Sequence, residues 1–278
     1  MTKIPSISVV CPTFNSEAYI ENTLESILKQ HLPPYEVIVS DDGSSDETIQ
    51  KLKHIQQKFE QKSICFKIIE NAHRGAGATR NSGVFAAQGE WIAFADADDP
   101  WKPEKLSVVS QAIQASPDTN FFLHWMEYLR LNGEVVLIPN GNKYNSDRPL
   151  PMQIYRRNFL PTPAVVCKKD LIVQVGGFDE DPAMIMEDYD LWLRMSPFVR
   201  LTVIKQALVT VVERRDSISA RHYWHRYVPT MKVLLRHWEK GGLVLLAYRS
   251  LRTTINKQWH RALLMKLRKQ QGHTHWNS

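Results

Sequence analysis

The stretch Trp91-Ile92-Ala93-Phe94-Ala95-Asp96-Ala97-Asp98-Asp99 decides the fold that we expect of this chain. Its first five residues form an apolar run that is typical of a buried strand in a parallel sheet. Three carboxylates follow, and like charges at this spacing repel one another unless a cation or a hydrogen-bonding ligand offsets them. Mg²⁺ and Mn²⁺ bind to one or two carboxylates together with substrate phosphates. The structural alternative is an acidic turn that caps a helix predicted at 102–115.

Apolar strands and amphipathic helices alternate over the N-terminal third, which predicts an α/β fold with a mostly parallel central sheet. The pattern predicts strands at 7–11, 35–40, 65–70 and 91–95, and helices at 16–30, 47–61 and 77–88. Open α/β sheets bind ligands at the carboxyl ends of their strands, where this chain places polar loops. Beyond residue 115 the pattern predicts strands at 121–131, 134–138, 164–168 and 201–213, a loop at 139–151 and a helix at 184–195.

The composition is that of a folded protein with a substantial core, since 43% of the 278 residues are hydrophobic and 10% are aromatic. The three cysteines are widely separated and include no Cys-Xaa-Xaa-Cys pair, which argues against a disulfide framework or a zinc site and favours a reducing compartment. The sequence contains no apolar run near the roughly 20 residues that span a bilayer.

The positive charge is concentrated at the C-terminus. Residues 221–278 contain 12 Lys and Arg residues against a single acidic residue, Glu239. Their helical spacing predicts a basic amphipathic tail, which could lie on an anionic membrane surface or pack on the body with its basic face in solvent. No nucleic-acid recognition motif accompanies this charge, so we do not expect a nucleic-acid partner.

Four polar segments follow the predicted strands of the N-terminal third. They are Pro12-Thr13-Phe14-Asn15, Asp41-Asp42-Gly43-Ser44, the stretch from Arg74 to Asn81, and Asp96-Ala97-Asp98. Acidic groups for a base or ribose, arginine for phosphate and a carboxylate-held metal would together form a nucleotide-diphosphate site. Taken singly, each has a structural explanation, such as a turn and helix cap at Asp41 or helix–sheet packing with a solvated Arg80.

Together these segments resemble glycosyltransferase family 2, whose members have the GT-A fold. The resemblance rests on 39–48 (VSDDGSSDET), 78–83 (ATRNSG), 94–99 (FADADD) and 187–194 (EDYDLWLR), and it covers roughly 7–219. It implies a GT-A, Rossmann-like domain at 1–220, with a nucleotide-sugar half at about 1–115 and an acceptor half at about 116–220. The basic helical tail at 221–278 would be an extension of this domain.

The resemblance also implies roles for individual residues. The donor would be bound by Pro12, Thr13, Asn15, Asp41, Asp42, Arg74, Arg80, Asp96 and Ala97. Asp98, with Asp96, would hold Mn²⁺ or Mg²⁺, and Arg214 with 217–219 would form a late loop over the donor phosphates. Asp188 would be the catalytic base, and Glu187 and Trp101 would lie on the acceptor side. Asp188 could instead be a carboxylate favoured by a helix N-terminus, and Trp101 could be a core residue.

The expected function is that of an inverting, metal-dependent glycosyltransferase. It would move a sugar from a nucleotide-sugar, a UDP-sugar by preference, to a glycan or lipid-linked acceptor in the synthesis of a cell-surface polysaccharide or lipopolysaccharide. We expect a cytoplasmic location, peripheral to the membrane if the tail binds lipid. One alternative, a sugar-phosphate nucleotidyltransferase, would need a Gly-rich basic loop where this chain has Pro12-Thr13-Phe14-Asn15. The other is a non-catalytic nucleotide-sugar binding protein, which the presence of Asp98 and Asp188 argues against.

Overall fold

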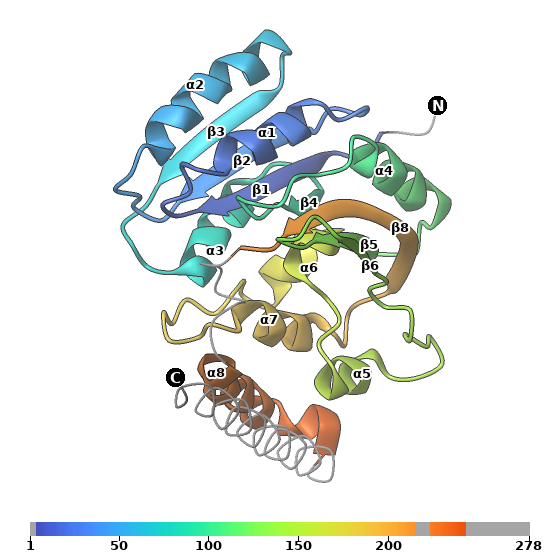
Figure 1. Ribbon diagram of the computed structural model, residues 1–278. Coiled ribbons are helices and arrows are strands. Elements are labelled where there is room, and N and C mark those ends of the chain that lie inside the picture. The colour runs from blue at the N-terminus through green and yellow to red at the C-terminus, as the bar shows by residue number, and fades with distance from the viewer. Residues whose placement is uncertain (1–3, 215–222, 243–278) are drawn as a thin grey trace, which may run out of the picture.

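The computed structural model describes residues 4–214 and 223–242. Its N-terminal part alternates strands and helices (Figure 1). The elements are β1 (Ile7–Thr13), α1 (Ile20–Leu28), β2 (Glu36–Asp41), α2 (Thr48–Gln61), β3 (Cys65–Glu70), α3 (Ala76–Ala86) and β4 (Trp91–Phe94). The four strands lie in the order β3-β2-β1-β4, and each neighbouring pair is parallel. The α/β fold predicted from the sequence is confirmed.

The rest of the chain extends the same sheet. The elements are α4 (Lys105–Ala115), β5 (Phe121–Leu129), β6 (Val135–Ile138), α5 (Leu150–Arg156), the 3₁₀ turn η1 (Thr162–Ala164), β7 (Val165–Lys168), α6 (Lys169–Gln174), α7 (Glu187–Met195), β8 (Leu201–Val212) and α8 (Tyr223–Arg236). Strand β7 lies antiparallel between β4 and β5, β6 lies antiparallel at the edge, and β8 pairs parallel with β5. The central sheet is therefore mixed but mostly parallel.

Helices cover both faces of the sheet, because successive strand residues point to opposite sides and both sets are apolar. In β1, Val9 and Cys11 belong to a core with residues of α1, α2 and α4, whereas Val10 belongs to a core with residues of α3, α5, α6 and α7. All three side chains are fully buried. The sheet is thus a rigid layer whose strand ends carry the polar loops.

Several predicted elements differ from the observed ones, as at the starts of α1, α4 and α7, which are predicted at 16, 102 and 184 and lie at 20, 105 and 187. Helix α1 begins at Ile20, because β1 continues to Thr13 and the carbonyl oxygen of Ser16 accepts hydrogen bonds from the amides of Tyr19 and Ile20 in a turn. The short helices α5 and α6 were not predicted, since seven and six residues are too few to establish a helical period. Burial of Ile154 and Tyr155 holds α5 in place.

The described part of the basic tail is α8 and the residues that follow it to 242. Val233 and Leu234 of α8 are buried in the same core as α7, and the Tyr155 hydroxyl donates a hydrogen bond of 2.9 Å to the Leu234 carbonyl oxygen. This part of the tail therefore packs on the body, and the tail beyond 242 lies outside the described residues. None of the helices in the described ranges is long and apolar enough to cross a membrane.

Candidate active site

The carboxyl ends of three parallel strands bring three of the predicted segments to one edge of the sheet. Thr13 at the end of β1 lies opposite Asp41 at the end of β2, and Val10 lies opposite Phe94 at the end of β4. Strand β4 is followed directly by Asp96-Ala97-Asp98. Since side-by-side parallel strands end at the same edge, the donor-side residues expected from the sequence are neighbours here.

The Asp41 carboxylate shapes the loop after β2. One of its oxygens accepts hydrogen bonds from the amides of Gly43 and Ser44, at 3.0 and 2.8 Å, and the other accepts one from the Ser44 hydroxyl. The Ser44 hydroxyl oxygen accepts a hydrogen bond of 2.8 Å from the amide of Asn15, whose side-chain oxygen accepts one of 2.9 Å from the Ser45 amide. Asn15 has a left-handed φ of 46°. The loops after β1 and β2 therefore form one structural unit.

Asp42 ties a third loop to the first two. Its carboxylate accepts hydrogen bonds from the backbone amides of Arg74 (2.8 Å) and Gly75 (3.0 Å). Gly75 has a φ of +93°, which favours glycine at this position. Asp42 also lies 2.9 Å from His73 Nδ1, and the His73 ring stacks on Phe14 with ring centroids 4.6 Å apart. The acidic pair at the end of β2 thus organises the loops around it. Asp41 forms the turn expected from the sequence, but it does not cap α2, which begins at Thr48.

Arg80 links the two halves of the site. This α3 side chain is only 12% exposed, forms an ion pair with Glu187 on α7, and lies 3.3 Å from Asp96 after β4. Burial lowers the pKa of Arg80, but the charges of Glu187, Asp96 and Asp188 raise it by more, so the net shift is upward. The solvated Arg80 of the structural alternative is therefore wrong. By contrast, the Arg74 guanidinium is well exposed and pairs with Glu180.

Asp188 lies in the first turn of α7, next to the Arg80–Glu187 pair. The Thr162 hydroxyl of η1 donates a long hydrogen bond of 3.4 Å to Asp188 Oδ2, and the Tyr189 amide donates to Oδ1 at 2.6 Å. Burial first, and then the charge of Glu187, raise the pKa of Asp188 to about 6. A carboxylate with this pKa is ionised at neutral pH and yet basic enough to accept a proton.

Asp96 and Asp98 each face an arginine from a distant segment. Asp98 forms an ion pair with Arg214, whose guanidinium also lies 4.2 Å from the centroid of the Tyr19 ring. Burial and the charges of Asp96 and Asp98 raise the pKa of the neighbouring Asp99 to about 8. Asp99 is therefore mostly protonated at neutral pH, while Asp96 and Asp98 are each paired with an arginine.

These residues fit a divalent metal only if the substrate contributes ligands. Carboxylate oxygens at 96 and 98 are the hard donors that Mg²⁺ and Mn²⁺ prefer, and their arginine partners show that the loop attracts cations. Over 4–214 and 223–242, no group of three or more His, Cys, Asp or Glu side chains is placed to hold a metal. Phosphate oxygens would therefore have to complete the coordination, as is usual for Mg²⁺.

Two of the predicted residues lie away from an open surface. Trp101 is 4% exposed and packs in the hydrophobic core, so its position favours the core interpretation over an acceptor-side role. Ala97 is also buried at 9% exposure, which leaves its backbone as the part available to a ligand. The sequence analysis missed Thr162 and His73, because neither belongs to one of the quoted motifs. Residues 217–219 of the predicted late loop lie outside the described residues.

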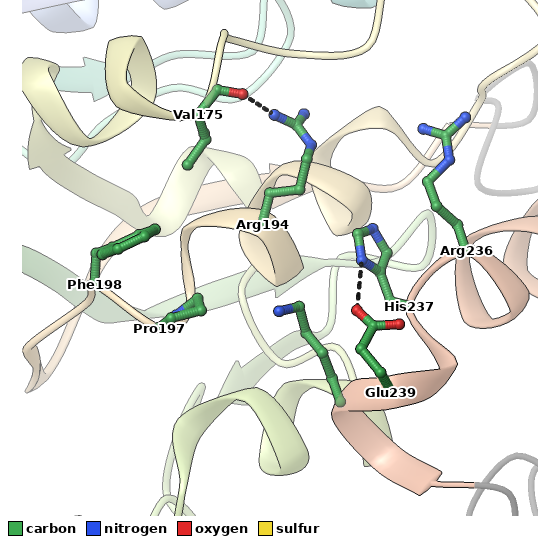
Figure 2. Close-up of a pocket in the computed structure, with 8 residues that line it drawn as sticks. Val175, Arg194, Pro197, Phe198, Arg236, His237 and Glu239 are labelled. Atoms are coloured by element: carbon green, nitrogen blue, oxygen red, sulfur yellow. Dashed lines mark hydrogen bonds and ion pairs between the residues drawn. The ribbon is translucent and has the colours of Figure 1, made fainter.

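A separate groove of about 610 Å³ lies between α7 and α8 (Figure 2). Its lining residues are Val175, Arg194, Pro197, Phe198, Arg236, His237, Glu239 and Lys240. The Arg194 guanidinium donates to Asp190 and to the carbonyl oxygens of Val175 and Gly177, so its donors already serve the fold. The groove contains none of the carboxylates of the strand ends, and we place the candidate site at those ends.

Comparisons with known proteins show the family and the fold of this chain. Residues 8–168 match the sequence model of Glycosyl transferase family 2. An uncharacterized glycosyltransferase of Haemophilus influenzae is 28% identical over 196 residues, which is 68% of this chain but only 61% of that protein. S. aureus TarS 1–349 in complex with UDP-GlcNAc has a TM-score of 0.69 at 24% identity, over 87% of this chain and 70% of that one. The mannosyltransferase PcManGT of Pyrobaculum calidifontis, in complex with GDP-Man and Mn²⁺, has a TM-score of 0.60 at 21% identity. The match covers 86% of this chain and 64% of PcManGT. The two structures share the fold of this chain.

Proposed function

This chain belongs to glycosyltransferase family 2, and on that premise we propose that it transfers a sugar from a nucleotide-sugar to an acceptor hydroxyl with inversion. The observation that carries the proposal is the position of Arg80, which contacts Asp96 on the donor side and Glu187 beside Asp188. Inverting transfer needs a base on the face of the sugar opposite the leaving nucleotide, and this arrangement holds a candidate base close to the donor loops.

The donor would bind across the ends of β1, β2 and β4. Pro12, Thr13, Asn15, Asp41 and Asp42 would contact the base and ribose, since they form the joined loops at this edge. The Thr13 hydroxyl is buried and has no hydrogen-bond partner among the described residues, so a ligand that reached it would satisfy a hydrogen bond that the fold leaves unmade. Arg74 and Arg80 would face the diphosphate side, with Asp96 and Ala97 near the ribose. The nucleotide-sugar complexes of TarS and PcManGT, with the same fold, support a nucleotide-sugar donor, and we favour a UDP-sugar.

A divalent metal, Mn²⁺ or Mg²⁺, would be held by Asp98 and Asp96 together with the donor phosphates. When bound, it would offset the negative charge that grows on the departing nucleoside diphosphate. The Mn²⁺ in the PcManGT complex supports this cofactor. Asp98 would then have to exchange its Arg214 partner for the metal, which would release the guanidinium toward the phosphates.

Asp188 would accept the proton of the acceptor hydroxyl. The hydroxyl oxygen would attack the anomeric carbon while the bond from that carbon to the diphosphate oxygen breaks, and the proton would pass to Asp188. The Thr162 hydroxyl would orient the carboxylate, and Glu187 would face the acceptor while paired to Arg80. A pKa of about 6 leaves Asp188 ionised at the start of the reaction at neutral pH.

The acceptor would be a glycan or a lipid-linked saccharide, as expected in the synthesis of a cell-surface polysaccharide. Helix α8 exposes Val228 and Leu235, Trp238 is exposed just after its end, and the exposed Lys232 lies in the same segment. An apolar and basic surface of this kind suits the interface of an anionic membrane, where a lipid-linked acceptor would lie. We therefore propose a cytoplasmic protein that docks peripherally on the membrane.

The decisive experiment measures release of nucleoside diphosphate from a panel of UDP-, GDP- and dTDP-sugars, with and without Mn²⁺, in the presence of a mixture of saccharide acceptors. We expect release from one class of donor, dependent on metal and strengthened by acceptor. Donor binding without turnover on any acceptor would favour a non-catalytic binding protein. Release of pyrophosphate from a sugar phosphate and a nucleoside triphosphate would instead identify a nucleotidyltransferase.

A further inference from the structure

Lys105, the first residue of α4, is fully buried. Its ammonium nitrogen donates a hydrogen bond of 2.9 Å to the carbonyl oxygen of Pro163 and lies 3.6 Å from the centroid of the Trp101 ring. Lysine is almost never fully buried unless it is paired, because removing its charge from water is costly. A carbonyl oxygen and an aromatic face offset only part of that cost.

The first contact leads to the proposed base. Pro163 lies in η1, which is the short turn that carries Thr162. Thr162 is 5% exposed, and its hydroxyl donates the hydrogen bond to Asp188 Oδ2. The Lys105 bond therefore restrains the backbone of the turn from which the Thr162 side chain projects.

The second contact leads to the proposed metal loop. Trp101 follows Asp98-Asp99-Pro100, and its backbone amide donates a hydrogen bond of 2.8 Å to the Ser26 hydroxyl of α1. The charges of Asp96 and Asp99 act on the Lys105 ammonium group and favour its charged form, although burial lowers the pKa of Lys105 by more. Lys105 thus contacts both segments: Trp101, which follows the loop that carries Asp98, and Pro163, which lies in the turn that carries Thr162.

An apolar residue of similar size would cost less to bury at this position than a lysine. Replacing buried charged groups by well-packed apolar side chains is often neutral or stabilising. Residues that break the rules of core composition tend to have a function. Lys105 is such a residue, and it contacts the turn that carries Thr162 and the segment that follows Asp98. A role in folding alone would not require an amine at 105, because an apolar side chain could fill the same space.

We propose that Lys105 is a positioning residue, which holds the turn carrying Thr162 against Asp188 and ties that turn to the loop carrying Asp98. This inference rests on the function proposed above for Asp188. Lys105 contacts no substrate. It acts through Thr162, whose hydrogen bond stabilises the ionised form of the base and sets the direction of its carboxylate oxygens.

The test compares Lys105→Met, Thr162→Val and the double variant by donor turnover, by the pH profile of kcat, and by calorimetric binding of UDP. Both single variants should lower kcat about 10- to 100-fold, by analogy with residues that orient metal ligands, and should leave the Kd for UDP unchanged. The acid limb of the profile should move to higher pH, because the ionised form of Asp188 loses a hydrogen bond. The double variant should be no slower than the slower single one, since both changes remove the same restraint.

Two controls separate positioning from general damage. Lys102→Met removes a charge three residues away, from a half-buried lysine that pairs with Glu127, and should leave kcat and the acid limb unchanged. Thr162→Ser retains the hydroxyl and should keep most of the activity. The inference would be overturned if the losses of kcat in the two single variants added up in the double variant. It would also be overturned if Lys105→Met folded and kept the kcat and the acid limb of the original protein.

The remaining outcomes are also informative. If Lys105→Met does not fold, Thr162→Val decides, and unchanged kcat in that variant overturns the inference. If the unmodified protein turns over no donor, the proposed function fails, and positioning is then measured by NMR titration of the Asp188 carboxyl group. An Asp188 pKa that rises in Thr162→Val and Lys105→Met supports positioning independently of turnover, and an unchanged value contradicts it.

Discussion

Arg80 on α3 and Glu187 on α7 form an ion pair across 107 residues of sequence, and both side chains are nearly buried. Arg80 also lies 3.3 Å from Asp96. One guanidinium thus connects the segment after β4 with the start of the helix that carries Asp188. The two halves of the proposed enzyme meet at this residue.

Arg80→Met should therefore damage both halves at once. It leaves the carboxylates of Asp96 and Glu187 facing each other without their cation, which removes one partner of a buried pair and costs about 3–5 kcal/mol in free energy of unfolding. We expect kcat/KM for the donor to fall about 100-fold, toward the upper end of the range for supporting residues. Chemical denaturation and steady-state kinetics measure the two effects.

The matched control is Arg130→Met, which removes an exposed arginine paired with Glu134. Exposed pairs contribute about 0–1 kcal/mol, so this variant should resemble the original protein in both measurements. If Arg80→Met matched the control in stability and turnover, the contacts of Arg80 with Asp96 and Glu187 would contribute nothing to folding or catalysis.

Asp98→Asn should remove the response to metal. Titration calorimetry of UDP with and without Mn²⁺ should show that Mn²⁺ strengthens binding to the original protein but not to the variant. Turnover should fall more than about 100-fold, because the metal supplies several kcal/mol of charge stabilisation in the transition state. Asp118→Asn, at an exposed position, serves as the control. Equal strengthening by Mn²⁺ in Asp98→Asn would exclude Asp98 as a ligand.

The pH dependence of kcat/KM for the acceptor follows from the pKa of Asp188, which burial and Glu187 raise to about 6. A general base must be ionised, so the rate should be level above pH 6 and fall about tenfold per unit below it. Asp99→Asn should leave this limb in place, because the pKa of Asp99, raised to about 8, belongs to a different buried group. A profile that stays level down to pH 5 would contradict the assignment of the base.

Asp190 should anchor α8 to the body. It is fully buried and pairs with Arg194, Arg236 and His237. Burial would raise the pKa of Asp190, but the hydrogen bonds from His237 and Arg194 lower it to about 2. The resulting stabilisation is complete above the unfolded pKa of about 3.9 and is lost as the pH falls toward 2.

Asp190→Asn should therefore lower the free energy of unfolding by about 3–5 kcal/mol at neutral pH, and the difference from the original protein should shrink as the pH falls below 4. Denaturant unfolding across this range measures both quantities. Asp170→Asn, in the first turn of α6 and exposed, should show little effect. A constant difference between pH 7 and pH 3 would show that the charge on Asp190 is not what stabilises α8.

The strand ends were predictable from the sequence because the signal is local. An apolar run such as 91–95 followed at once by carboxylates specifies both a buried strand and the edge at which it ends. The parallel order then brings Asp41 and Asp96 to one edge without further information. The two helices that sequence analysis missed, α5 and α6, are short and depend on tertiary contacts such as the burial of Tyr155.

The contacts inside the site were not predictable in the same way. The partners of Arg80 lie 16 and 107 positions away, and no periodicity indicates such a pair. Lys105 appeared only as part of a helical pattern, since its burial depends on how α4 meets η1. Trp101 shows the same limit, because one aromatic residue after an acidic loop suits a core or a binding surface equally well until the packing is known.

The most direct test of the central claim is the comparison of Asp188→Asn with the original protein in kcat and in the Kd for UDP. Asparagine keeps the shape of the side chain but cannot take a proton, so kcat should fall about 100- to 10,000-fold while the Kd for UDP stays within twofold. Turnover close to that of the original protein, or an equal loss of UDP affinity, would contradict the role of Asp188 as the base.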